Sequence, residues 1–204
     1  MPLVKAFRAR FPAASLAMLG GLSFYIQEWL ATGRIDIGIA YNPSPSPALE
    51  IIPFIEEELF LISPGPGRRK AAGKSSSRTT LPSLPLKELP RHPLIIPSRP
   101  NAIRMRVETQ LSASGLRPTV ALEIDAVPAI LDLVLEGYGH AVLPLNAIRG
   151  QPAGRFAARR FSKPLTTHLA LVVPAQRPST PLMRMTTDLI RTIGPGILAP
   201  GGKT

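Results

Sequence analysis

Apolar residues in the first fifth of the chain follow two different spacings. A helical spacing, with basic side chains on the opposite face, predicts a helix over residues 2–11. The apolar run at residues 15–19 predicts a short buried strand, and a helix capped by Ser23 then ends at Gly33. Residues 35–41 predict a strand of the kind that is buried on both faces in parallel sheets. Together these elements predict a β-α-β unit with a glycine turn at each junction.

Strand-like patterns continue in the next segment and then stop. Residues 50–55 and 58–63 predict two strands, with a solvated run of glutamates at the turn between them. Residues 64–85 are rich in Pro, Gly, Ser and basic residues, which predicts an exposed insertion. One short helical turn is expected at residues 86–89.

Strand and helix patterns alternate regularly in the second half of the chain. The predicted strands and helices lie at residues 94–97, 102–114, 119–124, 126–136 (capped by Asp125) and 140–143. This β-α-β-α-β order predicts a second open parallel sheet. A returning strand at 164–173 and an amphipathic helix at 182–193 follow, and the Gly/Pro-rich end from residue 194 predicts a frayed tail.

Composition restricts the class of protein. The chain has 204 residues, of which 45% are hydrophobic and 18% charged, as in globular proteins. It contains no cysteine, so disulfides and thiolate metal sites are excluded. No apolar run approaches the roughly 18 residues that a membrane span requires, and the N-terminus lacks the apolar core of a signal peptide. We therefore expect a cytoplasmic protein with no membrane partner.

The positive charge is concentrated in one segment. Residues 65–117 hold 11 of the 24 lysines and arginines but only Glu88 and Glu108, so they carry +9 of the net charge of +11. Much of this excess lies between Arg68 and Arg78, in a Gly/Ser-rich stretch without aromatic residues. Charge alone gives nonspecific attraction to nucleic acid. We therefore interpret this stretch as a solvated basic loop, with a DNA-contacting arm as the alternative.

Two glycine-containing motifs resemble those of one bacterial family. The stretch from Gly33 to Ala40 (GRIDIGIA) and the stretch from Glu136 to Pro144 (EGYGHAVLP) both place a glycine between a helix and a strand. In this order and spacing they resemble the effector-sensing domain of LysR-type transcription regulators. Gly21-Leu-Ser23, followed by WLATGRID at 29–36, is most similar to the nitrogen-assimilation-control branch. The resemblance implies an α/β fold with two Rossmann-like lobes of the type 2 periplasmic-binding-protein kind.

The resemblance also implies how the chain is divided and what it lacks. Compared with the family, the N-terminal winged helix-turn-helix and the first strand of the first lobe are missing, so we expect a truncated chain. The expected divisions are lobe I at 1–64 and 165–194, a basic flexible insertion at 65–85, lobe II at 86–164 and a tail at 195–204.

Candidate ligand-binding residues lie where strands lead into helices. In open α/β lobes, ligands bind outside the carboxyl ends of the strands, and helix N-termini favour anions there. The resemblance places effector contacts at Gly21, Leu22, Ser23, Tyr41, Ser98 and Arg99, and the junction residues Asn101 and Asp125 complete the set. The alternative is that Ser23 and Asn101 only cap helices and that Tyr41 only packs. Asp125 opposes an anionic effector.

The sequence gives little support for catalysis. His92, His140 and His168 lie on separate elements without metal-ligand spacing, and we expect His140 to meet solvent or a backbone carbonyl. No Gly-x-Ser-x-Gly elbow, P-loop or His-Glu-x-x-His motif occurs. We therefore expect no enzymatic activity, no metal and no cofactor.

The function implied by the resemblance is the sensing of a small metabolite between two lobes, which controls transcription. DNA would be engaged only indirectly, through the missing N-terminal domain, and the chain would form homo-oligomers or mixed oligomers with full-length relatives. Three alternatives stay open. The first is a solute-binding protein of the same fold. The second is an enzyme on that fold, for which only Asp125 and Tyr41 offer acid-base groups. The third is a basic nucleic-acid accessory protein built around Arg68 to Arg78.

Overall fold

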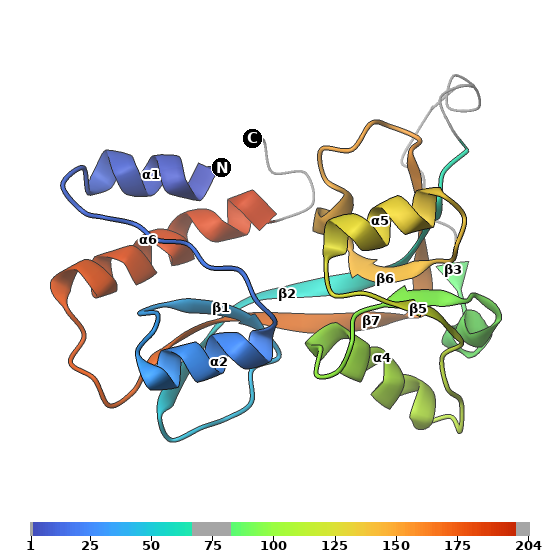
Figure 1. Cartoon of the computed structure of the whole chain (residues 1–204), viewed down its shortest axis with the longest axis horizontal. Helices are drawn as coiled ribbons and strands as arrows, with labels where there is room; N and C mark the ends of the chain where they lie inside the picture. The colour runs from blue at the N-terminus through green and yellow to red at the C-terminus, as the bar shows by residue number, and fades with distance from the viewer. Residues whose placement is uncertain (1, 67–82, 199–204) are drawn as a thin grey trace. The chain divides into compact units, whose positions relative to one another are not determined.

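The chain is built as two compact units that share two long strands. The computed structural model describes residues 2–66 and 83–198. Unit 1 comprises residues 1–56 and 168–204, and unit 2 comprises residues 57–167. The chain passes from unit 1 to unit 2 within β2 (Leu49–Pro64) and returns within β7 (Phe156–Pro174) (Figure 1). Each unit is therefore assembled around part of both strands.

In its described residues, unit 1 combines three helices and one short strand with its part of these two strands. Its other elements are α1 (Pro2–Arg10), α2 (Ser23–Thr32), β1 (Gly38–Tyr41) and α6 (Pro181–Leu198). β1 runs antiparallel to β7, with Gly38 opposite Val172. α2 packs on β1, and α1 packs on α6 (Figure 1). The buried core of this unit centres on Leu30, Ala40, Leu49 and Val172.

Two glycines determine how α2 meets β1. Gly33 ends α2 with a left-handed backbone (φ 80°), and its N–H donates to the carbonyl of Leu30 at 3.2 Å. A Cβ atom at Gly38 would lie 2.6 Å from Ile26 and 2.9 Å from Leu30. α2 can therefore lie directly on β1 because Gly38 has no side chain.

Unit 2 alternates strands and helices. Its elements are β3 (Ser83–Leu84), the 3-10 helix η1 (Leu86–Arg91), β4 (Leu94–Ile96), α4 (Ala102–Ser112), β5 (Val120–Glu123), α5 (Val127–Leu135), β6 (Ala141–Pro144) and the 3-10 helix η2 (Leu145–Ile148). β4 and β5 are parallel, and a parallel bridge joins Leu94 to His140 just before β6. β6 is antiparallel to β2, and β3 is parallel to β7.

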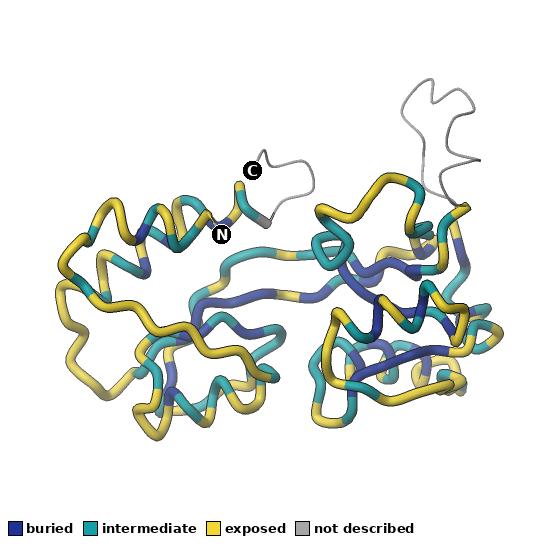
Figure 2. Tube along the Cα trace, turned by 45° about the horizontal axis from the view of Figure 1, so that its top comes forward, coloured by how far each residue is buried: buried dark blue, intermediate teal, exposed yellow. Residues whose placement is uncertain are grey.

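The core of unit 2 lies on both faces of β2. Leu59 and Leu61 pack into one buried cluster, whereas Phe60 and Ile62 pack into a second. This follows from the alternation of side chains along a strand. In Figure 2 the buried stretches follow the strands, while the helices keep exposed outer faces.

The predicted α/β class is confirmed, but the predicted parallel sheets are only partly present. The larger sheet is mixed, in the order β1-β7-β2-β6, with β3 paired to β7. The prediction that residues 35–41 form a strand in a parallel sheet is wrong, because β1 pairs antiparallel with β7. A continuous apolar run indicates burial on both faces but does not encode the direction of the partner strand.

The buried strand predicted for residues 15–19 is also wrong. These residues form exposed, irregular chain, and Met18 is 57% exposed. Among the described residues, no strand pairs with this segment. A short apolar run becomes a strand only where a neighbouring edge satisfies its backbone N–H and C=O groups. The predicted β-α-β unit is therefore reduced to α2 and β1.

The glutamate turn predicted between two strands is replaced by one continuous strand of 16 residues, β2. Two of its glutamates have partners within unit 2: Glu58 pairs with Arg160 at 2.6 Å, and Glu57 accepts from Nδ2 of Asn146 at 2.6 Å. These polar contacts let the charged positions stay within the strand.

The predicted tail and the predicted insertion both overlap regular secondary structure. The tail begins inside α6, and the insertion ends at β3. α6 continues to Leu198 and contains Pro195. A Cβ at Gly194 would lie 2.1 Å from the Phe54 ring, so the glycine allows α6 to pack closely there. Within the predicted insertion, Ser83 and Leu84 form β3, and Leu84 is fully buried. Most of the predicted insertion, including the basic stretch at 68–78, lies outside the described residues.

Candidate functional site

Ser98 and Asp125 tie together the carboxyl ends of β4 and β5. Because the two strands are parallel, the residues that follow them lie at the same edge. Oδ1 of Asp125 accepts from the Ser98 amide at 2.8 Å, and the Ser98 hydroxyl lies 2.7 and 2.8 Å from Oδ1 and Oδ2. Hydrogen bonds from the side chain and then the backbone of Ser98 lower the pKa of Asp125. Its carboxylate is therefore ionised at neutral pH.

The predicted capping role of Asp125 is wrong. The N-cap residue of α5 is Ala126, which makes no side-chain cap, and Pro128 lies in the first turn. Asp125 lies one position before the N-cap residue. Its carboxylate instead accepts hydrogen bonds from the amide and the hydroxyl of Ser98. The sequence could not reveal this pairing, because 27 positions separate the two residues.

Arg99 is also engaged by a carboxylate of the chain itself. Its Nη2 atom lies 2.8 Å from Oε2 of Glu108 on α4, although 62% of the Arg99 side chain is exposed. The other oxygen of Glu108 accepts from Nε of Arg104 at 2.9 Å. Burial would raise the pKa of Glu108, but hydrogen bonds from Arg104 and Arg99 outweigh this effect and lower it. The sequence assigned Arg99 to an effector, and the structure places it against α4.

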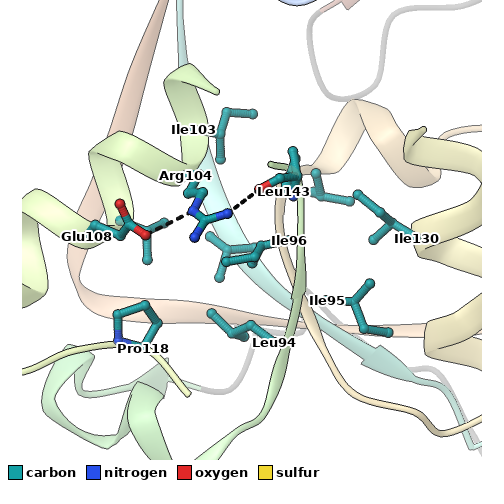
Figure 3. Close-up of a pocket in the computed structure, with 12 residues that line it drawn as sticks. Leu94, Ile95, Ile96, Ile103, Arg104, Glu108, Pro118, Ile130 and Leu143 are labelled. Carbon is teal, nitrogen blue, oxygen red and sulfur yellow. Dashed lines mark hydrogen bonds and ion pairs between the residues drawn. The ribbon is translucent and has the colours of Figure 1, made fainter. Parts of the chain in front are cut away.

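Arg104 is a buried guanidinium that joins three elements. Its Nη1 atom donates to the carbonyl of Pro97 at 2.9 Å and pairs with Oε2 of Glu123 at 2.9 Å. Figure 3 shows Arg104 reaching from α4 toward β4, with Glu108 beside it, around a small cavity of about 10 Å³. The hydrogen bond to Glu123 contributes most to raising the pKa of Arg104. This residue had no signal in the sequence, because a buried arginine in a helix cannot be told from an exposed one by its spacing alone.

Asn101 caps α4. Its Oδ1 atom accepts from the amides of Ile103 and Arg104, each at 3.0 Å. This is the capping alternative that the sequence left open for Asn101. Ser98, Arg99, Asn101 and Asp125 therefore lie together at one edge of unit 2.

In unit 1, Ser23 links the start of α2 to the end of β1. Its hydroxyl accepts from the amide of Tyr41 at 2.9 Å. The predicted cap by Ser23 is wrong, because the N-cap residue is Leu22 and it makes no side-chain cap. Four predicted residues, Gly21, Leu22, Ser23 and Tyr41, therefore lie at one junction of unit 1.

Two further features of this junction were not predicted. A Cβ at Gly21 would lie 2.8 Å from the Trp29 ring, so glycine is required where the chain passes this side chain. Gln27 forms a reciprocal pair with the backbone of Ser44, accepting at 3.1 Å and donating at 2.8 Å. The Gln27 pair ties the loop that follows β1 to α2, and the Gly21 contact brings the chain before α2 close to Trp29.

A groove of about 600 Å³ runs along α4 in unit 2. It is lined by polar and apolar residues from the loop before α4, from α4, and from the chain leading into β5. The lining residues are Arg99, Glu108, Thr109, Ser112, Leu116, Arg117, Pro118 and Val120.

The sequence profile described as "LysR substrate binding domain" matches residues 1–193. The chain belongs to this family. The sequence motifs that predicted it, GRIDIGIA and EGYGHAVLP, lie at the end of α2 with β1 and at the end of α5 with β6. The predicted family is confirmed.

The relatives of this LysR-family chain are transcriptional regulators. It is 25% identical to the nitrogen assimilation regulatory protein nac of Escherichia coli (strain K12) over 195 residues, which cover 95% of this chain. The corresponding protein of Klebsiella aerogenes is 22% identical over the same length. In both cases the chain spans about 60% of the length of the relative.

Solved LysR-family structures have the same fold. The CcmR regulatory domain of Synechocystis PCC6803, in complex with 2-PG, matches with a TM-score of 0.78 and 15% identity, covering 94% of this chain and 89% of that domain. The effector binding domain of QuiR, in complex with shikimate, matches with a TM-score of 0.77 and 15% identity, covering 95% and 88%. The predicted two-lobed architecture of the periplasmic-binding-protein kind is thereby confirmed.

Two histidines of this LysR-family chain meet in unit 2. The rings of His92 and His140 are 5.0 Å apart, edge to face, and Nδ1 of His140 lies 2.8 Å from the hydroxyl of Ser63. His140 is half-buried and its amide donates to the Pro93 carbonyl at 2.8 Å, whereas the contacts of its ring with side chains remote in sequence were not predicted. Among residues 2–66 and 83–198, no group of three or more His, Cys, Asp or Glu side chains could hold a metal ion. Within the same residues, no helix is long and apolar enough to cross a membrane.

Proposed function

We propose that this chain is the effector-sensing part of a LysR-type transcriptional regulator. It binds a small metabolite, and binding controls transcription through a DNA-binding domain of the complete regulator. The observation that carries the proposal is the family match over residues 1–193, in a chain whose β4 and β5 end together beside the start of α4 and α5. Such strand ends are where open α/β sheets bind ligands.

The proposed contacts come from two junctions. Gly21, Leu22, Ser23 and Tyr41 belong to the junction of unit 1, and Ser98, Arg99, Asn101 and Asp125 belong to that of unit 2. A metabolite that binds one arrangement of the protein better than another shifts the population toward it, and the size of the shift equals the difference in binding free energy.

The relatives favour this function over the alternatives. They are regulators, whereas solute-binding and enzymatic roles have no support among them. We therefore propose a cytoplasmic, non-enzymatic role. Direct sequence-specific DNA binding by residues 1–204 is not part of the proposal.

The test is thermal unfolding of the purified chain against a panel of amino acids, nucleotides, polyols, amines and carboxylic acids. A ligand that binds only the folded state raises Tm by mass action. We expect at least one metabolite to raise Tm by several degrees in a concentration-dependent way. A cooperative transition that no compound in the panel moves would contradict the proposal.

We also propose self-association, because each unit exposes apolar side chains that a soluble monomer would normally cover. Unit 1 exposes Leu16, Met18 and Leu19, and unit 2 exposes Met105, Val120 and Leu122. All four residues of β5 are exposed at the edge of the two-stranded sheet, and its one charged residue, Glu123, pairs with Arg104. A second copy, or a full-length relative, supplies the covering surface.

Light scattering after size-exclusion chromatography tests the self-association. We expect a dimer or a larger assembly, and a shift toward monomer in Met18→Asp and Val120→Asp. The matched control is Met185→Asp on α6, which is also exposed and lies outside both groups. A wild-type monomer at high concentration would contradict this proposal and would leave the metabolite proposal intact.

A further inference from the structure

The donors at the start of α4 are already occupied by the chain's own carboxylates. The amide and hydroxyl of Ser98 are both directed at Asp125, at 2.7–2.8 Å. A helix N-terminus with a serine hydroxyl normally offers such donors to a ligand anion. Here the carboxylate of Asp125 lies where that anion would bind.

Arg99 gives an independent indication of the same kind. Its guanidinium pairs with Glu108, whose second oxygen is held by Arg104. Arg104 is only 9% exposed and also binds the Pro97 carbonyl and Glu123. Because Arg104 is held in this way, it also holds Glu108 in position. A ligand anion would have to displace a positioned carboxylate from Arg99 as well.

The charged side chains at this edge also disfavour the binding of an anion. Arg99 and Arg104 face three carboxylates, those of Glu108, Glu123 and Asp125. Asp125 is exposed, and an ionised carboxylate has about four lone-pair positions, so part of its capacity to accept hydrogen bonds faces solvent. The named side chains therefore carry two positive and three negative charges, and the exposed Asp125 keeps capacity to accept hydrogen bonds.

We propose that Asp125 determines which ligand chemistry this edge of unit 2 accepts. Its carboxylate replaces a ligand anion, so the edge excludes carboxylates and phosphates and binds a ligand through N–H or O–H donors, as in an amine or a polyol. The proposal rests on the proposed metabolite-sensing function and narrows the class of metabolite that unit 2 accepts.

Four small probes separate the two chemistries. Putrescine, 1,4-butanediol and succinate share a four-carbon skeleton and differ only in their end groups, and inorganic phosphate is the simplest anion. Each is titrated into the ¹⁵N-labelled full chain while the amide resonances of Ser98 and Ala126 are followed. In the wild type we expect putrescine and 1,4-butanediol to shift these resonances, and succinate and phosphate to leave them in place.

Asp125→Ala should reverse this selectivity. Removing the carboxylate opens the amide and hydroxyl of Ser98, so phosphate should bind at least about tenfold more tightly, the size expected when a charge-assisted hydrogen bond becomes available. Putrescine should bind at least about tenfold more weakly. Asp125→Asn keeps the shape and removes the charge, so it should lose putrescine binding even if the alanine variant folds poorly.

Asp132→Asn is the matched control, since Asp132 is an exposed carboxylate on α5 and the charge change is the same. It should behave as the wild type with all four probes. Equal phosphate or succinate responses in wild type and Asp125→Ala would overturn the proposal. So would amides that stay unmoved by putrescine and 1,4-butanediol, or putrescine binding that survives in Asp125→Asn.

The outcome is separable from that of the proposed function. If the probes behave as expected but no metabolite stabilises the chain, the sensing function fails and the selectivity of the edge stands. If a metabolite stabilises the chain but its binding is insensitive to Asp125→Asn, only the selectivity fails.

Discussion

The hydroxyl of Ser63 on β2 and Nδ1 of His140, just before β6, lie 2.8 Å apart although 77 positions separate the two residues. The ring of His140 also meets His92 edge to face at 5.0 Å. Burial, followed by the positive charges of His92 and Arg159, lowers the pKa of His140. Burial and Arg159 lower the pKa of His92, and Glu88 partly opposes this. Both pKa shifts favour the neutral imidazole over the charged form.

This histidine pair should make the protein sensitive to acid. A histidine with a lowered folded pKa binds fewer protons in the folded state than in the unfolded state. The free energy of unfolding should therefore be greatest above the unfolded pKa of about 6.5 and fall as the pH drops through the folded values. Urea unfolding followed across this range measures the slope. His140→Gln and His92→Gln should flatten it, and a slope unchanged in both variants would contradict this prediction.

Ser23→Ala should destabilise unit 1 by about 1 kcal/mol, because the amide of Tyr41 loses its hydrogen-bond acceptor. Urea unfolding provides the measurement, and Ser23→Thr should retain most of the stability. Ser15→Ala, in the exposed segment before α2, is the control and should change the free energy of unfolding little. Equal effects of Ser15→Ala and Ser23→Ala would argue against a structural role for the Ser23 hydroxyl.

Arg104→Met should cost about 2–3 kcal/mol, since it leaves Glu108 without its buried partner. The double variant Arg104→Met/Glu108→Leu should regain part of this loss, because no buried charge then remains unpaired, and Arg99 and Glu123, which lose their partners, are exposed to solvent. Arg160→Gln, which breaks the more exposed pair with Glu58, should cost less than Arg104→Met. A loss in the double variant as large as the sum of the two single losses would rule out direct coupling of the two charges.

Gly38→Ala should destabilise the protein by about 1–3 kcal/mol, the usual cost of overpacking. The added Cβ would lie 2.6 Å from Ile26 and 2.9 Å from Leu30, so α2 would have to move away from β1. Gly20→Ala meets no atom within 4 Å and should stay within about 0.5 kcal/mol of the wild type. Thermal unfolding of the two variants in parallel decides whether α2 lies on β1 as closely as described.

Local patterns predicted the helices well and the strands less well. α1, α2, α4 and α5 were expected within a few residues, because helical periodicity and terminal glycines lie within one short stretch of chain. The segment at 15–19 and the glutamate turn within β2 were wrong because strand formation depends on a partner that is distant in sequence. The prediction for α6 stopped too early, since the close packing of Gly194 against Phe54 is invisible in the sequence.

At the candidate site, too, local features were predicted and contacts between residues distant in sequence were not. The sequence placed Ser98, Arg99 and Asp125 at strand-to-helix junctions, and these residues do lie at one edge of unit 2. It also predicted donors directed at a ligand, whereas the structure directs them at Asp125 and Glu108. The buried Arg104 and the pair of His92 and His140 had no signal in the sequence, because their partners come from other elements.

The sequence by itself determined the family, the α/β class and the positions of the strand-to-helix junctions, because these depend on periodicity, glycines and residue order over short distances. Only the tertiary structure decided which strands pair, which charges are buried and which donors already have acceptors. Those properties depend on contacts between residues far apart in the chain, such as Arg104 with Glu123 and Ser98 with Asp125, which form when parallel β4 and β5 bring their ends together.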